Sequence, residues 1–175
     1  PTAMSLTAPR QIYDPERIRQ AVEYTADRIV ARMGDEHPII ALALLNGALW
    51  FAADLLRLLP PNYILETARV SSYGDAQQSS GKLRWFTPPP DCRGKRVLLL
   101  DDVLDTGLTL HHVRQTLREG GAHEVLTAVA IEKDIPRQHC PHADFAALHT
   151  GDRYLIGYGM DARGKYRNLP DICEL

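Results

Sequence analysis

Residues 97–110 read VLLLDDVLDTGLTL, and this run decides the fold that we expect. The first four residues are apolar without a break, which is typical of a strand buried on both faces in a parallel sheet. Asp101 and Asp102 follow, at the point where we expect the strand to leave the sheet. Residues 105–109 then form a short turn that leads into a helical pattern of apolar residues. The run therefore predicts a strand, a turn and a helix of an α/β protein.

The turn at residues 105–109 has the chemistry of an anion site. Ligands of open α/β sheets bind outside the carboxyl ends of the strands, and a helix N-terminus there offers N–H groups that suit a phosphate. Gly107 lets the backbone come close to a ligand, and Thr106 and Thr109 add hydroxyl donors. Because the preceding carboxylates suit ribose hydroxyls, the run predicts a sugar-phosphate site. An Asp-Thr-Gly turn is also an ordinary helix cap, and that interpretation stays open.

The rest of the chain alternates between apolar strand patterns and helical patterns. Asp14-Pro15-Glu16 has the capping residue, proline and acid of a helix start, and Gly34 ends that helix. Further helices are expected to end at Pro60-Pro61 and at Gly120-Gly121. The expected strands are residues 39–45, 63–70, 97–100, 124–131, 144–148 and 154–158. This order predicts one α/β domain over residues 1–175, with a mostly parallel sheet flanked by helices.

The composition excludes several classes of protein. The 175 residues are 45% hydrophobic and 24% charged, as in ordinary globular domains, and the net charge of −2 gives no electrostatic basis for binding nucleic acid or an anionic membrane. No apolar run approaches the length of a membrane span. Residues 1–10 lack the apolar core of a signal peptide and are expected to be a loose leader. The three cysteines are odd in number and widely spaced, which indicates reduced thiols in the cytoplasm.

Residues 71–90 differ in character from the rest of the chain. They are polar at first, include Ser72 and Tyr73, offer one short edge strand at residues 82–86, and end in Pro88-Pro89-Pro90. A long polar loop within a domain is either a linker, a solvated loop or a functional lid. A linker would need a second domain, for which too little chain lies on either side. We therefore expect a lid, with a solvated loop as the alternative.

Three other strand ends carry polar residues, and each also has a purely structural interpretation. Asn46-Gly47 predicts a backbone loop for a second anion, or a plain turn. Lys133 follows a buried strand and is either a ligand-binding or a solvated lysine. Residues 154–161 combine an apolar strand, two glycines and an acid, which suits a flat slot for a ring or the edge of the core. The segment His139-Cys140-Pro141-His142 has no partner pair elsewhere, so we do not expect it to bind zinc.

Residues 97–110 resemble the phosphoribosyl-pyrophosphate (PRPP) signature of type I phosphoribosyltransferases. The motifs along residues 14–175 together resemble hypoxanthine-guanine phosphoribosyltransferases: Asn46-Gly47, Ser72-Tyr73, Asp101 to Thr109, Lys133, Tyr154 to Asp161, and Arg167. The resemblance implies the type I phosphoribosyltransferase fold, with a small hood from residues 144–175 and a mobile lid at residues 71–90. It also implies purine salvage, in which PRPP and a 6-oxopurine give IMP or GMP and pyrophosphate. Mg²⁺ and a homodimer or homotetramer belong to the same expectation.

The resemblance further implies a role for each matched position on the PRPP side. Asp101 and Asp102 would contact the ribose hydroxyls, directly or through the metal. The 5′-phosphate would be held by the turn, that is by Asp105, Thr106, Gly107, Leu108 and Thr109. Pyrophosphate would be bound by Asn46, Gly47 and Arg167, and Ser72 and Tyr73 would belong to the lid.

The same resemblance assigns the purine side. Asp105 would act as general base at N7, and Lys133 would bind the exocyclic O6. Tyr154 would stack on the ring, and Leu155 would meet its edge through the backbone. Asp161 would join the purine site and bind Mg²⁺ with Asp101 and Asp102. A lysine only donates hydrogen bonds, so it pairs with a 6-oxo group and not with the 6-amino group of adenine.

Asn46 departs from the pattern, because the family usually has a basic residue there. Weaker PRPP binding or a shifted substrate is the expected consequence. Two alternatives to a hypoxanthine-guanine enzyme stay open: a xanthine-preferring phosphoribosyltransferase, and a nucleotide-binding regulator built on the same fold. Asp105 speaks against the regulator, since a protein that only binds nucleotides has no use for a general base.

Overall fold

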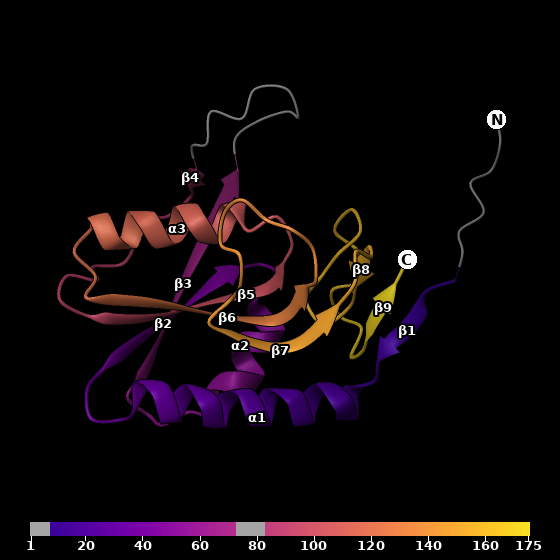
Figure 1. Ribbon diagram of the computed structural model, residues 1–175, viewed down its shortest axis with the longest axis horizontal. Helices are drawn as coiled ribbons and strands as arrows, with labels where there is room; N and C mark the ends of the chain where they lie inside the picture. The colour runs from indigo at the N-terminus through magenta and orange to yellow at the C-terminus, as the bar shows by residue number, and fades with distance from the viewer. Residues whose placement is uncertain (1–7, 73–82) are drawn as a thin grey trace.

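A six-stranded sheet forms the centre of the computed structural model, which describes residues 8–72 and 83–175 (Figure 1). Its strands follow one another in the order β4-β3-β2-β5-β6-β7. Neighbouring strands are parallel except for β4, which is antiparallel to β3. The bounds are β2 (Ile39–Leu45), β3 (Tyr63–Ser72), β4 (Leu83–Trp85), β5 (Arg96–Leu104), β6 (Glu124–Lys133) and β7 (Phe145–Thr150). The mostly parallel sheet expected from the sequence is confirmed.

Helices cover both faces of this sheet, so its central strands are buried on both sides. Successive strand residues point to opposite faces. Ile39 and Ala41 of β2 belong to the core beneath α1 (Pro15–Met33) and α2 (Leu49–Leu56). Ile40 and Leu42 belong to the second core, beneath α3 (Leu108–Glu119). Figure 1 shows α3 on one side of the sheet and α1 and α2 on the other.

Helix α1 begins and ends where its sequence predicts. The Asp14 side chain accepts a hydrogen bond from the Arg17 N–H at 2.7 Å, and Pro15 occupies the first helical position. Gly34 ends the helix with a φ of 70°, a conformation that glycine adopts without steric cost. None of the described helices is long and apolar enough to cross a membrane.

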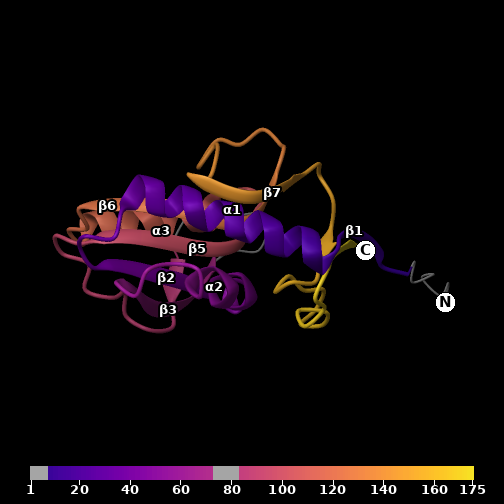
Figure 2. The same cartoon turned by 90° about the horizontal axis from the view of Figure 1, so that it is seen from below.

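A second, three-stranded sheet lies beyond the carboxyl ends of the central strands (Figures 1 and 2). We use the name hood for this sheet, made of β1 (Arg10–Tyr13), β8 (Leu155–Ile156) and β9 (Ile172–Glu174), together with Tyr154 just before β8 and the turns of residues 157–171. Strand β9 pairs antiparallel with β1 on one side and with β8 on the other. The hood therefore joins segments from opposite ends of the chain.

The structure corrects the bounds of three expected segments. The hood was expected from residue 144, but β7 is the edge strand of the central sheet. The loose leader was expected through residue 10, but Arg10 already begins β1, and residues 1–7 lie outside the described residues. The strand expected over residues 154–158 is limited to Leu155–Ile156, because Gly157 and Tyr158 have φ angles of 88° and 47° that bend the chain.

Strand β5 is longer than expected, and this changes where its acids lie. We expected the strand to leave the sheet at Asp101, but β5 continues to Leu104. Asp101 is in register with Val129 of β6, and Leu104 is in register with Glu132. The apolar residues after the two acids keep the strand in the sheet. The acids thus belong to the strand, and only the turn from Asp105 onward lies beyond it.

The expected lid at residues 71–90 is described only at its two ends. Ser71 and Ser72 still belong to β3, and β4 returns antiparallel to them, with Ser72 in register with Leu83. Tyr73 lies outside the described residues. The lid and its residues Ser72 and Tyr73 stay a prediction, as does the single-domain organisation.

Candidate active site

Polar residues gather where β2, β5, β6 and β7 end, at the edge of the sheet that faces the hood (Figure 1). A cavity of about 200 Å³ lies there between the strand ends and the hood. It is lined by Asp102, Val103, Asp105, Lys133, Tyr154, Leu155, Met160 and Asp161. Six of these eight positions are site residues that the sequence predicted, and the fold brings them together from four separate segments of the chain.

Asp101 and Asp102 are consecutive carboxyl groups near the carboxyl end of β5. The Asp102 N–H donates to Asp101 Oδ1 at 2.9 Å, and the Val103 N–H donates to Asp102 Oδ1 at 2.7 Å. Burial raises the pKa of Asp101 well above its ordinary value, and the Asp102 charge adds to the rise. Burial also raises the pKa of Asp102, although the Val103 hydrogen bond and Arg167 partly offset it. The ionised form of such a buried pair is stabilised when hydroxyl donors or a cation take the place of the lost water.

The turn after β5 presents backbone N–H groups, as an anion site requires. Gly107 has a φ of 78° at the start of α3, and no side chain caps that helix. A Cβ at Gly107 would lie 2.5 Å from the His139 carbonyl oxygen, so a larger residue does not fit. The Leu108 N–H donates to the Thr106 hydroxyl over 3.4 Å, which is long for a hydrogen bond. A phosphate oxygen would readily replace this weak acceptor.

The Asn46-Gly47 loop lies against the acids of β5. A Cβ built on Gly47 would be 2.0 Å from Asp102 Oδ2, and a Cβ built on Gly159 would be 2.0 Å from the Gly47 carbonyl oxygen. Gly47 is therefore held between β5 and the hood, while Asn46 is exposed. The Leu45–Asn46 peptide bond is cis. The loop expected to bind an anion thus borders the acids expected to contact ribose.

Lys133 and Asp105 form an ion pair at the wall of the cavity. Lys133 Nζ lies 2.9 Å from Asp105 Oδ2, and the lysine side chain is only 10% exposed while the aspartate is 48% exposed. Asp152, which was not expected at the site, lies 3.7 Å from the same Nζ. A cation donor and a carboxylate acceptor thus stand next to each other, and the carboxylate faces the open side.

The hood supplies the other wall of the cavity. Tyr154 is 57% exposed, and its hydroxyl lies 3.4 Å from the Asp161 carbonyl oxygen. Leu155 is buried next to it. Arg167 Nη2 pairs with Asp161 Oδ1 at 2.8 Å, and Arg167 Nη1 donates to the Gly159 carbonyl at 2.5 Å. An aromatic ring, an acid and an arginine are thus fixed opposite the strand ends.

The donor set fits Mg²⁺ that is held mainly by a substrate. Asp102 and Asp161 both line the cavity, and carboxylate oxygens are the ligands that Mg²⁺ prefers. Within residues 8–72 and 83–175, no three acidic, histidine or cysteine side chains converge as a metal site. Mg²⁺ is commonly bound by one or two carboxylates together with substrate phosphates, which is the arrangement that these residues allow.

Comparisons with known proteins agree with this geometry. The phosphoribosyl transferase domain model matches residues 10–145. The hypoxanthine-guanine phosphoribosyltransferase of Aquifex aeolicus is 37% identical over 158 residues, which cover 90% of this chain and 89% of that protein. The chain belongs to the hypoxanthine-guanine phosphoribosyltransferase family. This conclusion confirms the family expected from the sequence motifs.

Two further family members bear on the fold and the substrate. The crystal structure of a hypoxanthine-guanine phosphoribosyltransferase from Bacillus anthracis matches with a TM-score of 0.86 at 26% identity, over 97% of this chain and 99% of that chain. The type I phosphoribosyltransferase fold is thereby confirmed. A hypoxanthine-guanine-xanthine phosphoribosyltransferase from Tritrichomonas foetus is 29% identical over 168 residues, which cover 93% of this chain and 89% of that protein.

One residue of the region, Arg137, was not expected from the sequence. Its side chain is 1% exposed and pairs with Glu132, whose side chain is 3% exposed, at 3.4 Å. A signal was present, because Glu132 stands in an otherwise apolar strand pattern. A buried carboxylate needs a partner, and Arg137 is the next arginine along the chain.

Proposed function

We propose that this protein is a purine salvage enzyme that transfers the 5-phosphoribosyl group of PRPP to hypoxanthine or guanine. The observation that carries this proposal is the Lys133–Asp105 pair in the cavity, with 2.9 Å between Nζ and Oδ2. A 6-oxopurine with its imidazole proton on N7 offers an acceptor, O6, beside a donor, N7–H. Lys133 and Asp105 offer the complementary donor and acceptor. Tyr154, on the hood, supplies an exposed ring for stacking.

In the proposed reaction, N9 of the purine bonds to C1′ of PRPP while the bond from C1′ to pyrophosphate breaks. The N7 proton passes to the Asp105 carboxylate, so that the product is a neutral purine ring on the nucleotide. General base catalysis of this kind contributes about 10²–10⁴-fold. Asp101 and Asp102 would bind the ribose hydroxyls, and the N–H groups of residues 106–109 would hold the 5′-phosphate.

Pyrophosphate would be bound by Asn46, Gly47 and Arg167. The proposed metal is Mg²⁺, held by Asp161 together with Asp101 or Asp102 and the oxygens of PRPP. When bound, Mg²⁺ neutralises charge that develops on the leaving pyrophosphate. Arg167 adds a positive charge on the same side, although the charge usual at position 46 is missing because Asn46 is neutral.

Lys133 also accounts for the choice of base. An ammonium group facing the 6-amino group of adenine places donor against donor and leaves both without a partner. An unpaired buried donor costs about 1–3 kcal/mol, which corresponds to about 5- to 150-fold in discrimination. We therefore infer that adenine is a poor substrate. Contacts to position 2 of the purine would come from the backbone near Leu155, so the side chains do not separate hypoxanthine from guanine.

A panel of bases tests this proposal directly. The protein is incubated with PRPP, Mg²⁺ and hypoxanthine, guanine, xanthine or adenine, and nucleotide formation is followed. We expect IMP and GMP to form rapidly and AMP to form slowly or not at all. Binding of PRPP without turnover of any base would favour the regulator. A preference for xanthine is the second candidate function. It is included because the Tritrichomonas foetus relative is a hypoxanthine-guanine-xanthine phosphoribosyltransferase.

The Asp105→Asn variant tests the proposed base. Asparagine keeps the size of the side chain but cannot take up a proton. We expect kcat to fall by about 10²–10⁴-fold while the KM for PRPP changes little. An equal loss in both parameters would assign Asp105 to PRPP binding alone.

The proposal also covers the oligomeric state and the cellular location of the enzyme. We propose a homodimer or homotetramer, supported by apolar side chains that are exposed around α2 and along β3: Leu49, Leu58, Ile64 and Leu65. Light scattering of the purified protein tests this. We also propose a cytoplasmic location, supported by the free thiols of Cys92, Cys140 and Cys173.

A further inference from the structure

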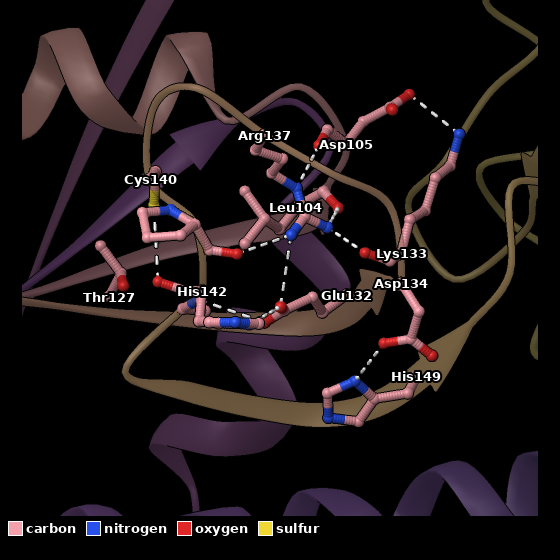
Figure 3. Close-up of polar contacts among 12 residues, drawn as sticks. Leu104, Asp105, Thr127, Glu132, Lys133, Asp134, Arg137, Cys140, His142 and His149 are labelled. Carbon is pink, nitrogen blue, oxygen red and sulfur yellow. Dashed lines mark hydrogen bonds and ion pairs between the residues drawn. The ribbon is translucent and has the colours of Figure 1, made fainter.

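The Arg137 side chain lies behind the ion pair of the active site, in the loop that follows β6 (Figure 3). Its Nε donates to the Asp105 carbonyl at 2.5 Å, and its Nη2 donates to the carbonyls of Leu104, at 3.2 Å, and Lys133. Its Nη1 donates to the Pro141 carbonyl at 2.8 Å. One guanidinium group thus contacts the ends of both strands that carry the proposed base and the proposed O6 ligand.

These contacts lie where the pairing of β5 and β6 ends. The last pair in register is Leu104 with Glu132, so Asp105 and Lys133 stand at the next position along the two strands. There the chain of β5 turns away toward α3. Arg137 bridges the carbonyls of Asp105 and Lys133 at this point, and so replaces the strand pairing that would otherwise hold them.

The positive charge of Arg137 is paired with a buried carboxylate and is not directed at a substrate. Glu132 Oε1 lies 3.4 Å from Arg137 Nη1, and both side chains are almost completely buried. Glu132 is itself fixed, because Oε2 accepts the Ala143 N–H at 3.1 Å and Oε1 lies 2.8 Å from His142 Nδ1. Figure 3 shows the guanidinium enclosed by these partners, while the Lys133 and Asp105 side chains meet on its far side.

We propose that Arg137 is a positioning residue that sets the separation of Asp105 and Lys133 for the purine. The inference rests on the proposed function, in which these two groups bind N7–H and O6 of the same base. Only an arginine has the planar fork of five donors that reaches four carbonyls and a carboxylate at once. A lysine keeps the charge beside Glu132 but supplies a single ammonium group.

The test is the Arg137→Lys variant. A displacement of about 1 Å in a reacting group costs about 10²-fold, so we expect kcat with hypoxanthine to fall by about ten- to a hundredfold. The 5′-phosphate would be held at the start of α3, which is packed into the core through its buried Leu110, Val113 and Leu117. The KM for PRPP is therefore expected to stay within about threefold, and this split separates positioning from general damage.

Arg96→Lys is the matched control. Arg96 bridges the same two strands at their opposite end, where Nε contacts Glu124 at 2.9 Å and Nη1 donates to the Met33 carbonyl at 2.5 Å. It is therefore expected to shift the urea midpoint but to leave kcat within about twofold of the parent. Equal kcat losses in the two variants would assign Arg137 to stability and overturn the proposal, as would an Arg137→Lys enzyme with the kcat of the parent.

A second variant covers the case in which Arg137→Lys does not fold. Arg137→Ala removes the whole side chain, and guanidinium chloride at concentrations far below those that unfold proteins is added back. We expect kcat to rise with guanidinium and not with sodium chloride at the same ionic strength. If neither variant folds, or if guanidinium restores nothing, Arg137 is structural and the proposal is wrong. If the parent enzyme uses neither hypoxanthine nor guanine, the proposed function is wrong as well. If the parent is active and the Arg137 variants are unaffected, only this inference is wrong.

Discussion

Gly47→Ala is predicted to damage the active site far more than its single methyl group suggests. A Cβ at this position would lie 2.0 Å from Asp102 Oδ2 and 2.5 Å from Asp102 Cγ. Since Cβ atoms in proteins essentially never approach a neighbour closer than 3.0 Å, the separation must grow by at least 1.0 Å (3.0 − 2.0). Turning the carboxylate does not provide this, because Cγ itself is too close.

Neither partner of this contact can move without disturbing its own neighbours, and the loop is the more tightly held of the two. The Asp102 carboxylate is fixed by the Val103 N–H at 2.7 Å. The loop cannot retreat either, because the Gly47 carbonyl oxygen already occupies the space beside Gly159, where a Cβ would find it at 2.0 Å. The displacement of about 1 Å therefore falls on the acids proposed to bind the ribose of PRPP.

A shift of this size costs about 10²-fold in rate, or about 2.7 kcal/mol of transition-state stabilisation. We expect kcat/KM for PRPP to fall by about that factor, and the free energy of unfolding to fall by about 1–3 kcal/mol through overpacking. Steady-state kinetics and urea unfolding measure the two effects separately. Gly151→Ala is the control, because a Cβ there meets nothing within 4 Å and the position is not left-handed. A Gly47→Ala enzyme within about threefold of the parent, with Gly151→Ala equally active, would refute the reasoning.

Three further predictions concern the charged groups. Asp101→Asn is expected to stabilise the ligand-free protein at pH 7, because burial raises the pKa of Asp101. A carboxyl with a raised pKa contributes stability below its ordinary pKa of about 3.9 that is lost as the pH rises through the raised value, so urea midpoints of parent and variant should converge toward about pH 4. Lys133→Gln offers both a donor and an acceptor, so the preference for hypoxanthine over adenine in kcat/KM should shrink by up to about tenfold; an unchanged ratio would contradict the O6 contact. Excess EDTA should abolish IMP formation and added Mg²⁺ should restore it; full activity in EDTA would exclude a required divalent metal.

Local sequence patterns predicted most of the central sheet, because the parallel strands are buried on both faces and therefore apolar throughout. The strand at Ile39–Leu45 and the start of α1 at Asp14-Pro15 were predicted to the residue. The end of β5 was not, because acidic residues normally mark the place where a strand meets water. Here both acids are still part of β5, a central strand of the sheet. The raised pKa values of Asp101 and Asp102 reflect the cost of burying their charged forms.

Local sequence patterns could not predict features that depend on contacts between distant segments of the chain. Strand β1 has an unremarkable sequence, and its partner β9 lies some 160 residues away along the chain, as the pairing of Arg10 with Glu174 shows. The bridging by Arg137 likewise depends on where two strands diverge. The site residues themselves were predicted from motif order, and their roles stay predictions until variants are assayed.

The pairing of β1 with β9 has a consequence for the order in which this enzyme is assembled. During synthesis β1 emerges before the described strands of the central sheet, but its partner Ile172–Glu174 emerges only after them. A growing chain can therefore form the turn proposed to bind phosphate long before the wall carrying Tyr154 is secured. The proposed purine pocket is therefore completed only after the central sheet, and a nascent chain that stops short of β9 leaves β1 without its neighbour.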